Sequence, residues 1–70
     1  MKKIQGERML RAARQRLGLR VLDVAAAARI SEGRLYRIEQ GRTRATDEER
    51  ARLADALGQT VALLFPEVTP

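Results

Sequence analysis

The sequence predicts an all-helical, compact fold built from five short helices. Apolar residues recur three and four positions apart along most of the chain, the spacing that places them on one face of a helix. Glycine follows three of these stretches, at Gly18, Gly41 and Gly58, where helices commonly end. Serine or threonine precedes three of them, at the N-cap position. We therefore expect one helical domain over residues 1–70.

The first helix is predicted from Glu7 to Leu17 and is stopped by Gly18. One stripe of this helix carries Leu10, Ala13, Arg14 and Leu17. Residues 1–5 are expected to form a flexible basic arm.

Two helices separated by a sharp turn are predicted next, over residues 21–28 and 32–40. The first has small inward residues and starts after Arg20, which is a poor N-cap. The second is capped by Ser31, turns Leu35 and Ile38 inward, and ends before Gly41. The pair is a helix-turn-helix formed by the second and third helices.

The last two helices are predicted from about 47 to 57 and from 61 to 65. Thr46 to Glu49 form a capping box for the fourth helix, which turns four residues inward: Ala51, Leu53, Ala54 and Leu57. Thr60 caps the fifth helix and Pro66 ends it. Residues 67–70 are expected to be frayed.

The composition excludes several classes of function. The chain has no cysteine and no histidine, so disulfides and the usual zinc or haem sites are excluded. Its only serine, Ser31, has no histidine to activate it. We expect neither enzymatic activity nor a cofactor, metal or small-molecule ligand. No membrane-spanning run or secretory signal is present, so we expect a cytoplasmic protein of a bacterial or phage-infected cell.

Charge is distributed unevenly around the net value of +5. Lysine and arginine outnumber acids by eight to two over residues 1–30 and by four to two over 31–46, whereas acids lead by five to two over 47–70. A basic segment over residues 1–46 and an acidic segment over residues 47–70 suit a protein that neutralises phosphates on one side only. The predicted helix at 32–40 also turns arginines outward. A short helix supported by another and presenting arginines suits the major groove of DNA.

Several elements follow one another in a single register over roughly residues 7–66: Arg14 and Gly18-Leu19, Val24-Ala25, Ile30-Ser31, Leu35, Ile38-Glu39-Gln40-Gly41, Leu53-Ala54, Leu57-Gly58 and Leu64-Phe65-Pro66. Together they resemble the helix-turn-helix domain of the phage repressor and Cro family, also called the Xre family. The resemblance implies a repressor-like five-helix domain that binds double-stranded DNA.

The resemblance also implies roles for individual residues. DNA bases would be contacted by Glu32, Gly33, Arg34 and Arg37, and the DNA backbone by Arg20, Ser31, Tyr36, Arg42, Thr43 and Arg44. Arg37 is the strongest base-reading candidate because arginine can bond guanine O6 and N7 together. Glu32 can accept from a cytosine amino group or simply favour the helix N-terminus. Tyr36 can touch a thymine methyl group or a phosphate, or cover the flank of the domain. Arg14 and Glu39 would form a structural ion pair, the alternative being two ordinary surface charges.

Two residues depart from the family pattern. Val21 stands where a glutamine often holds a phosphate, and Arg20 is the expected substitute. Arg29 stands where the turn often has glycine, so either the arginine is strained or the turn differs.

We expect a sequence-specific transcriptional regulator, a repressor that acts as a homodimer. The predicted dimer interface is Val61, Leu63, Leu64 and Phe65, because five consecutive apolar residues cannot all face one core. Packing against the first helix is the alternative for them. Two other functions remain open: an antitoxin or other module of the same fold that binds a partner protein, and non-specific architectural DNA binding.

Overall fold

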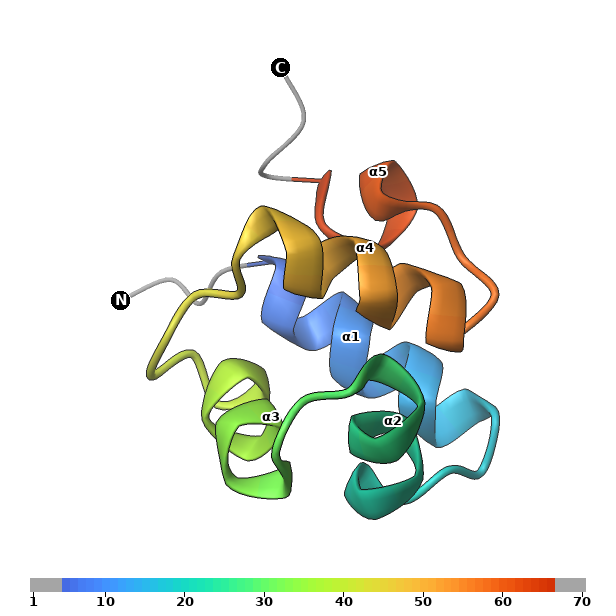
Figure 1. The fold of residues 1–70 in the computed structure, drawn as a ribbon. Coiled ribbons are helices and arrows are strands. Elements are labelled where there is room, and N and C mark those ends of the chain that lie inside the picture. The colour runs from blue at the N-terminus through green and yellow to red at the C-terminus, as the bar shows by residue number, and fades with distance from the viewer. Residues whose placement is uncertain (1–4, 67–70) are drawn as a thin grey trace.

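The computed structural model describes the backbone of residues 5–66 and the side chains of residues 9–66. This part of the chain contains five helices and no strand, as the sequence predicts. The helices are α1 (Gln5–Arg16), α2 (Val21–Ala28), α3 (Glu32–Glu39), α4 (Asp47–Ala56) and α5 (Val61–Leu64). Figure 1 shows α2 and α3 together at one end of the domain and α5 at the other.

Helix α1 differs from its predicted bounds at both ends. Gln5 already belongs to the helix, so the predicted start at Glu7 was late and the expected arm over residues 1–5 was wrong at its last position. Residues 1–4, with Lys2 and Lys3, lie outside the described residues. The helix ends at Arg16, and Gly18 reverses the chain with φ of 69°. Leu17 therefore lies in the turn and is exposed, although its spacing predicted an inward position.

The turn between α2 and α3 keeps its left-handed conformation without a glycine. Arg29 ends α2 with φ of 58° and ψ of 48°, and Arg29 is the only non-glycine residue with positive φ over the described backbone. Its side chain is exposed, and Ile30 N–H bonds back to Ala25 O at 2.9 Å. Of the two possibilities that the sequence left open for Arg29, a strained arginine and a different turn, the second is therefore excluded. Ser31 then starts α3 by accepting from Arg34 N–H at 3.1 Å.

The start of α4 is a complete capping box. Thr46 Oγ1 accepts from Glu49 N–H at 3.1 Å, and Thr46 N–H donates to Glu49 Oε1 at 2.8 Å. The predicted inward position of Ala51 was wrong, because this residue is exposed. Ala51 lies about 200° around the helix axis from the fully buried Leu53.

Helix α5 is a single turn capped by Thr60, whose Oγ1 accepts from Leu63 N–H at 3.1 Å. Leu64 and Phe65 are only 2% and 5% exposed, so their prediction as dimer-interface residues was wrong. Both turn into the domain's own core, where α5 packs on α1 and α4. Val61 and Leu63 remain exposed. Residues 67–70, predicted to be frayed, lie outside the described residues.

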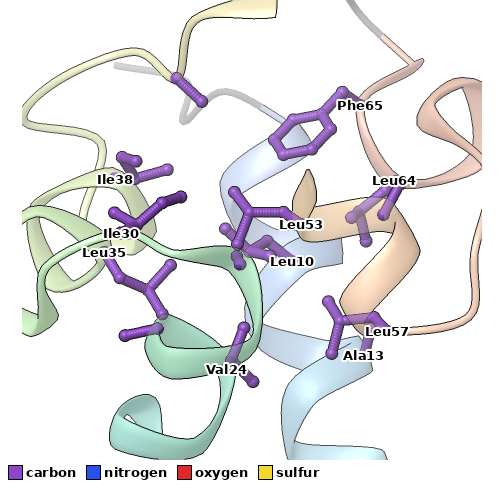
Figure 2. Close-up of a cluster of buried hydrophobic side chains, with 14 residues drawn as sticks. Leu10, Ala13, Val24, Ile30, Leu35, Ile38, Leu53, Leu57, Leu64 and Phe65 are labelled. Atoms are coloured by element: carbon purple, nitrogen blue, oxygen red, sulfur yellow. The ribbon is translucent and has the colours of Figure 1, made fainter. Parts of the chain in front are cut away.

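The core is a single apolar cluster to which all five helices contribute (Figure 2). Its fully buried large side chains are Leu10, Val24, Leu35, Leu53 and Leu64. Ala25 and Ala28 are buried on α2, where their small side chains let α3 and α4 pack close to that helix. Truncating a fully buried leucine to alanine in such a core costs about 2–5 kcal/mol. The core thus fixes α3 from its inner side and leaves its outer side to solvent.

Candidate nucleic-acid interface

Helix α3 has one buried side and one exposed side. Leu35, Ile38 and Glu39 are buried on the inner side. Four residues that the sequence assigned to DNA contacts lie exposed on the outer side: Glu32, Gly33, Tyr36 and Arg37. The structure therefore brings these four together on one surface of a helix that its neighbours hold from behind.

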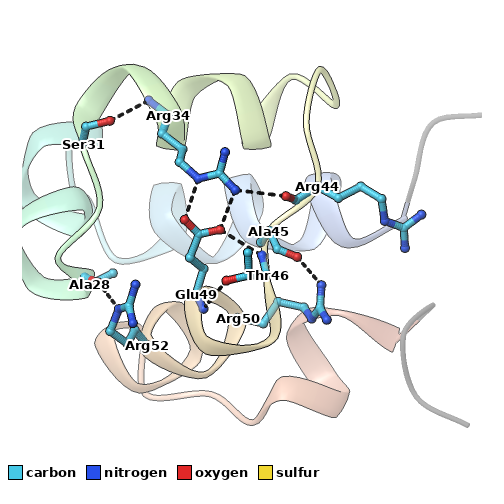
Figure 3. A network of polar contacts seen from close by, with 9 residues as sticks. All are labelled: Ala28, Ser31, Arg34, Arg44, Ala45, Thr46, Glu49, Arg50 and Arg52. Carbon is cyan, nitrogen blue, oxygen red and sulfur yellow. Dashed lines mark hydrogen bonds and ion pairs between the residues drawn. The ribbon is translucent and has the colours of Figure 1, made fainter.

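Arg34 is used differently from its sequence-based assignment. Its Nε and Nη2 donate to the two carboxylate oxygens of Glu49 on α4, at 2.5 and 2.7 Å, and Nη2 also donates to Arg44 O at 3.2 Å (Figure 3). These three bonds use the N–H groups on Nε and Nη2 and direct the guanidinium toward α4. The structure thus places Arg34 as a link between α3 and α4, and not with the four outward residues.

The Arg34–Glu49 pair changes the titration of both groups. Hydrogen bonds from Arg34 hold the pKa of Glu49 at about 2, against an ordinary value of 4.5, although partial burial opposes this shift. The backbone N–H of Thr46 stabilises the same carboxylate. In turn, the pKa of Arg34 is raised by its hydrogen bonds to Glu49. The carboxylate of the capping box is therefore also the anchor for the third helix.

Arg37 lies over Gly33, one turn earlier on the same helix. A Cβ atom at Gly33 would lie 3.6 Å from Arg37 Nη1, an ordinary van der Waals contact. Because side chains on a helix lean toward its N-terminus, residue 37 can cover residue 33. The guanidinium of the exposed Arg37 is thus brought to the N-terminal half of the outward face, next to Gly33.

Arg14 and Glu39 form the ion pair that the resemblance implied. Arg14 Nε and Nη2 donate to the carboxylate oxygens of Glu39 at 2.8 and 3.0 Å. The side chains are only 12% and 4% exposed, so these are not ordinary surface charges. The hydrogen bonds to Glu39 raise the pKa of Arg14, and its Nη1 donates to Leu19 O at 2.9 Å. The pair ties α1 and the following loop to the last residue of α3.

The start of α2 carries a local charge pair. Asp23 accepts from the backbone N–H of Arg20 at 2.8 Å and from its guanidinium at 3.2 Å. The side-chain bonds lower the pKa of Asp23 and raise that of Arg20. Asp23 thus satisfies the backbone N–H of Arg20, whereas Arg20, which has no acceptor on its side chain, gives no side-chain cap to the first N–H groups of α2. Arg20 remains 75% exposed and extends toward solvent.

The loop after α3 contains three residues predicted to contact the DNA backbone. Arg42 and Arg44 are exposed and Thr43 is half-buried. Gly41, with φ of 77°, leads the chain from α3 into this loop. The Arg44 carbonyl is held by Arg34, while its side chain points away from the polar network (Figure 3). Ser31 is exposed at the other end of α3, where its Oγ accepts the capping hydrogen bond from the backbone N–H of Arg34.

Two arginines of α4 have structural roles that the sequence analysis missed. Arg52 Nε donates to Ala28 O at 2.7 Å and satisfies a carbonyl at the end of α2. Arg50 donates to Ala45 O (Figure 3). It also pairs with Asp47. The capping box was a usable signal for Glu49, but nothing in the local sequence indicates the partners of Arg34 or Arg52, which lie 15 and 24 residues away.

None of the helices described over residues 5–66 is both long and apolar enough to cross a membrane. Comparison with curated proteins and with solved structures gives no significant match. A family model described as a helix-turn-helix domain matches residues 8–64, which is most of the chain. This agrees with the resemblance to the Xre and Cro type and with the paired α2 and α3. The chain therefore belongs to the helix-turn-helix family of DNA-binding domains.

Proposed function

We propose that the protein is a sequence-specific regulator of transcription, a repressor that reads double-stranded DNA with the outward face of α3. The observation that carries this proposal is the composition of that face. Its exposed residues, Glu32, Gly33, Tyr36 and Arg37, include hydrogen-bonding and apolar groups matched to base edges, while its inner residues hold the helix in place.

Arg37 is proposed to read a guanine. Its guanidinium lies next to Gly33, where no side chain separates it from an approaching base pair. A bidentate bond to guanine O6 and N7 provides about 1–3 kcal/mol of discrimination. Glu32 lies on the same face at the helix N-terminus and can accept from a cytosine amino group. Arg34 is left out of the base-reading set because Glu49 and the Arg44 carbonyl already hold its guanidinium.

The DNA backbone contacts are proposed to lie on both sides of α3. The exposed Arg42 and Arg44, with Thr43 between them, follow the helix, and Ser31 precedes it. Arg20 adds a positive charge at the start of α2, and the carboxylate of Asp23, to which it is bonded, partly offsets this charge. Such contacts orient the protein on DNA and carry no sequence information directly.

The base-reading role can be tested by selecting binding sites from random duplexes with the wild-type protein and with Arg37→Ala. The expected result is one enriched sequence whose preference is lost at a single base pair in the variant. Arg11→Ala removes the same charge from an exposed position on α1 and should keep every preference. If the wild-type protein enriches no sequence, specific regulation is excluded and non-specific binding remains.

A dimer is proposed because one domain of this size covers only half of an operator, with half-sites about one helical turn apart. Val61 and Leu63 are the large exposed side chains of α5, and Leu63 is 59% exposed. Sedimentation of the protein, alone and with a two-half-site duplex, should show a dimer that Leu63→Asp weakens. Leu17→Asp changes a similarly exposed leucine, in the turn after α1, as a control. A monomer at high micromolar concentration in both mixtures would contradict the proposal.

A further inference from the structure

A shallow apolar hollow lies at the junction of α2 and α3, within the surface proposed to meet DNA. It is lined by Val21, Glu32, Gly33 and Tyr36 and has a volume of about 380 Å³. Most of the lining is apolar, and the hollow is open to solvent. Val21 starts α2, and the other three residues lie on the first two turns of α3.

Two arginines, Arg37 and Arg20, flank this apolar surface, whose lining also includes the acidic residue Glu32. Arg37 Nη1 lies within 3.6 Å of the Cβ position of Gly33, and Gly33 is part of the lining. Arg20 directly precedes Val21 and lies close enough to Glu32 for their charges to interact. An apolar patch set among arginines fits an occupant that is apolar at one point and anionic around it. The major-groove edge of a DNA duplex meets this description, whereas an apolar protein segment would offer the Arg37 guanidinium no anion.

We propose that the hollow receives the 5-methyl group of a thymine or of a 5-methylcytosine in the major groove. That methyl group is the only apolar substituent that the bases present there, and it distinguishes thymine from unmethylated cytosine. Val21 and the ring of Tyr36 supply the apolar contact, and the absent side chain of Gly33 lets the base edge approach. The departure of Val21 from glutamine, which removes a phosphate contact, thereby provides a contact to a base.

The proposal rests on the proposed DNA-binding function and adds one base position to the DNA sequence that the protein should recognise. Because Gly33 belongs to the hollow and also lies beneath the Arg37 guanidinium, the methylated pyrimidine should stand next to the guanine that Arg37 reads. The selected sequence should therefore contain a thymine beside the base pair whose preference is lost in Arg37→Ala.

The methyl group can be removed alone by replacing each thymine of the selected site with deoxyuridine, one at a time. Burial of one methyl group predicts that one such replacement weakens binding about fourfold. Cytosine at that position should bind more weakly than 5-methylcytosine by a similar factor. Both ratios are measured by titration of labelled duplexes at fixed salt concentration, because affinity for DNA depends on salt.

Four variants assign the effect to the hollow. Tyr36→Ala and Val21→Ser should bring the thymine-to-uracil ratio close to one, whereas Tyr36→Phe should keep it, since the ring remains. Leu22→Ser alters an exposed residue of α2 outside the hollow and should also keep it. Because Tyr36 is exposed, its variants test the proposal even if Val21→Ser fails to fold.

The outcomes separate this proposal from the function on which it rests. If no sequence is enriched, the proposed function fails and the methyl contact with it. If a sequence is enriched but no thymine responds to loss of its methyl group, only the methyl contact fails, as expected for a hollow that binds a protein. A methyl effect that persists in Tyr36→Ala and Val21→Ser would also overturn it.

Discussion

Arg34 on α3 and Glu49 on α4 are joined by two hydrogen bonds, of 2.5 and 2.7 Å, between guanidinium and carboxylate. Glu49 also closes the capping box of α4 with Thr46. One carboxylate therefore starts a helix and holds the neighbouring helix against it. Protonation of Glu49 would weaken both functions together.

The first prediction concerns stability at acid pH. The pKa of Glu49 is about 2 in the folded protein and 4.5 ordinarily, so the folded state favours the ionised form. This contribution is fully present above about pH 4.5 and is lost as pH falls toward 2. Glu49→Gln should therefore lower the melting temperature most above pH 5, with the difference from wild type shrinking toward pH 2. Glu48→Gln, at an exposed neighbouring position, serves as the control.

Thermal unfolding followed by circular dichroism between pH 2 and pH 7 provides the measurement. If the difference in melting temperature between wild type and Glu49→Gln stays constant over this range, the contribution of Glu49 to stability does not depend on the ionisation of its carboxyl group.

The second prediction concerns the pair Arg14–Glu39, whose side chains are largely buried. Arg14→Met leaves the Glu39 carboxylate without its partner and should lower the free energy of unfolding by about 3 kcal/mol. Replacing both residues, as Arg14→Met with Glu39→Leu, removes the unpaired charge and should cost much less than the sum of the single changes.

Urea unfolding of wild type, both single variants and the double variant forms a complete thermodynamic cycle. Arg11→Met at an exposed position of α1 should change stability by no more than about 0.5 kcal/mol. Additive effects of the two single changes would show that the pair is not coupled.

Helix positions and starts were largely predictable because they depend on local chemistry, although α1, α3, α4 and α5 each end one residue before the predicted end. The bounds of α2 follow from its apolar spacing, and α3 and α4 start after Ser31 and Thr46 as predicted, because these side chains cap their own helices. The inward placement of Leu35 and Ile38 follows from the same periodicity.

The uses of individual charged and apolar side chains were less predictable because they depend on which helices meet. Arg34 looks like an outward residue of α3, but α4 places a carboxylate within its reach. Leu64 and Phe65 looked available for a partner, yet a single-turn helix leaves them free to turn into the core between α1 and α4. Arg14–Glu39 was anticipated only through the family resemblance, since the two residues are 25 positions apart.

The third prediction concerns the turn at Arg29, a residue with positive φ of 58°. A left-handed conformation costs a residue with a Cβ atom about 1–2 kcal/mol, whereas glycine adopts it freely. Allowing for the greater freedom of glycine in the unfolded chain, Arg29→Gly should raise the free energy of unfolding by about 1 kcal/mol. For a domain of this size that is a rise of roughly 4–8 °C in melting temperature.

Arg29→Ala separates the backbone effect from the loss of charge, because alanine retains the Cβ atom. Arg29→Asn should lie between the two, since asparagine tolerates this conformation better than most residues. Equal melting temperatures for the glycine and alanine variants would show that the turn relaxes and that Arg29 is not strained.

The fourth prediction concerns Gly33, where folding and DNA binding make different demands. Glycine in a helix costs about 0.5–1 kcal/mol relative to alanine, and a Cβ at this position meets only Arg37 Nη1, at 3.6 Å. Gly33→Ala should therefore stabilise the fold by about 0.5 kcal/mol, toward the lower end because the residue lies in the first turn. The added methyl group also stands between α3 and an approaching base pair, so affinity for the selected DNA site should fall.

Urea unfolding and DNA titration of the same preparation measure the two effects. Ala51→Gly, at an exposed position of α4, calibrates the cost of glycine in this chain and should leave DNA affinity unchanged. A variant Gly33→Ala that gains stability and binds DNA as tightly as wild type would show that glycine is not needed for close approach. Opposite changes in stability and affinity would instead place Gly33 at the contact with DNA, because a helix selected for stability alone has no use for it.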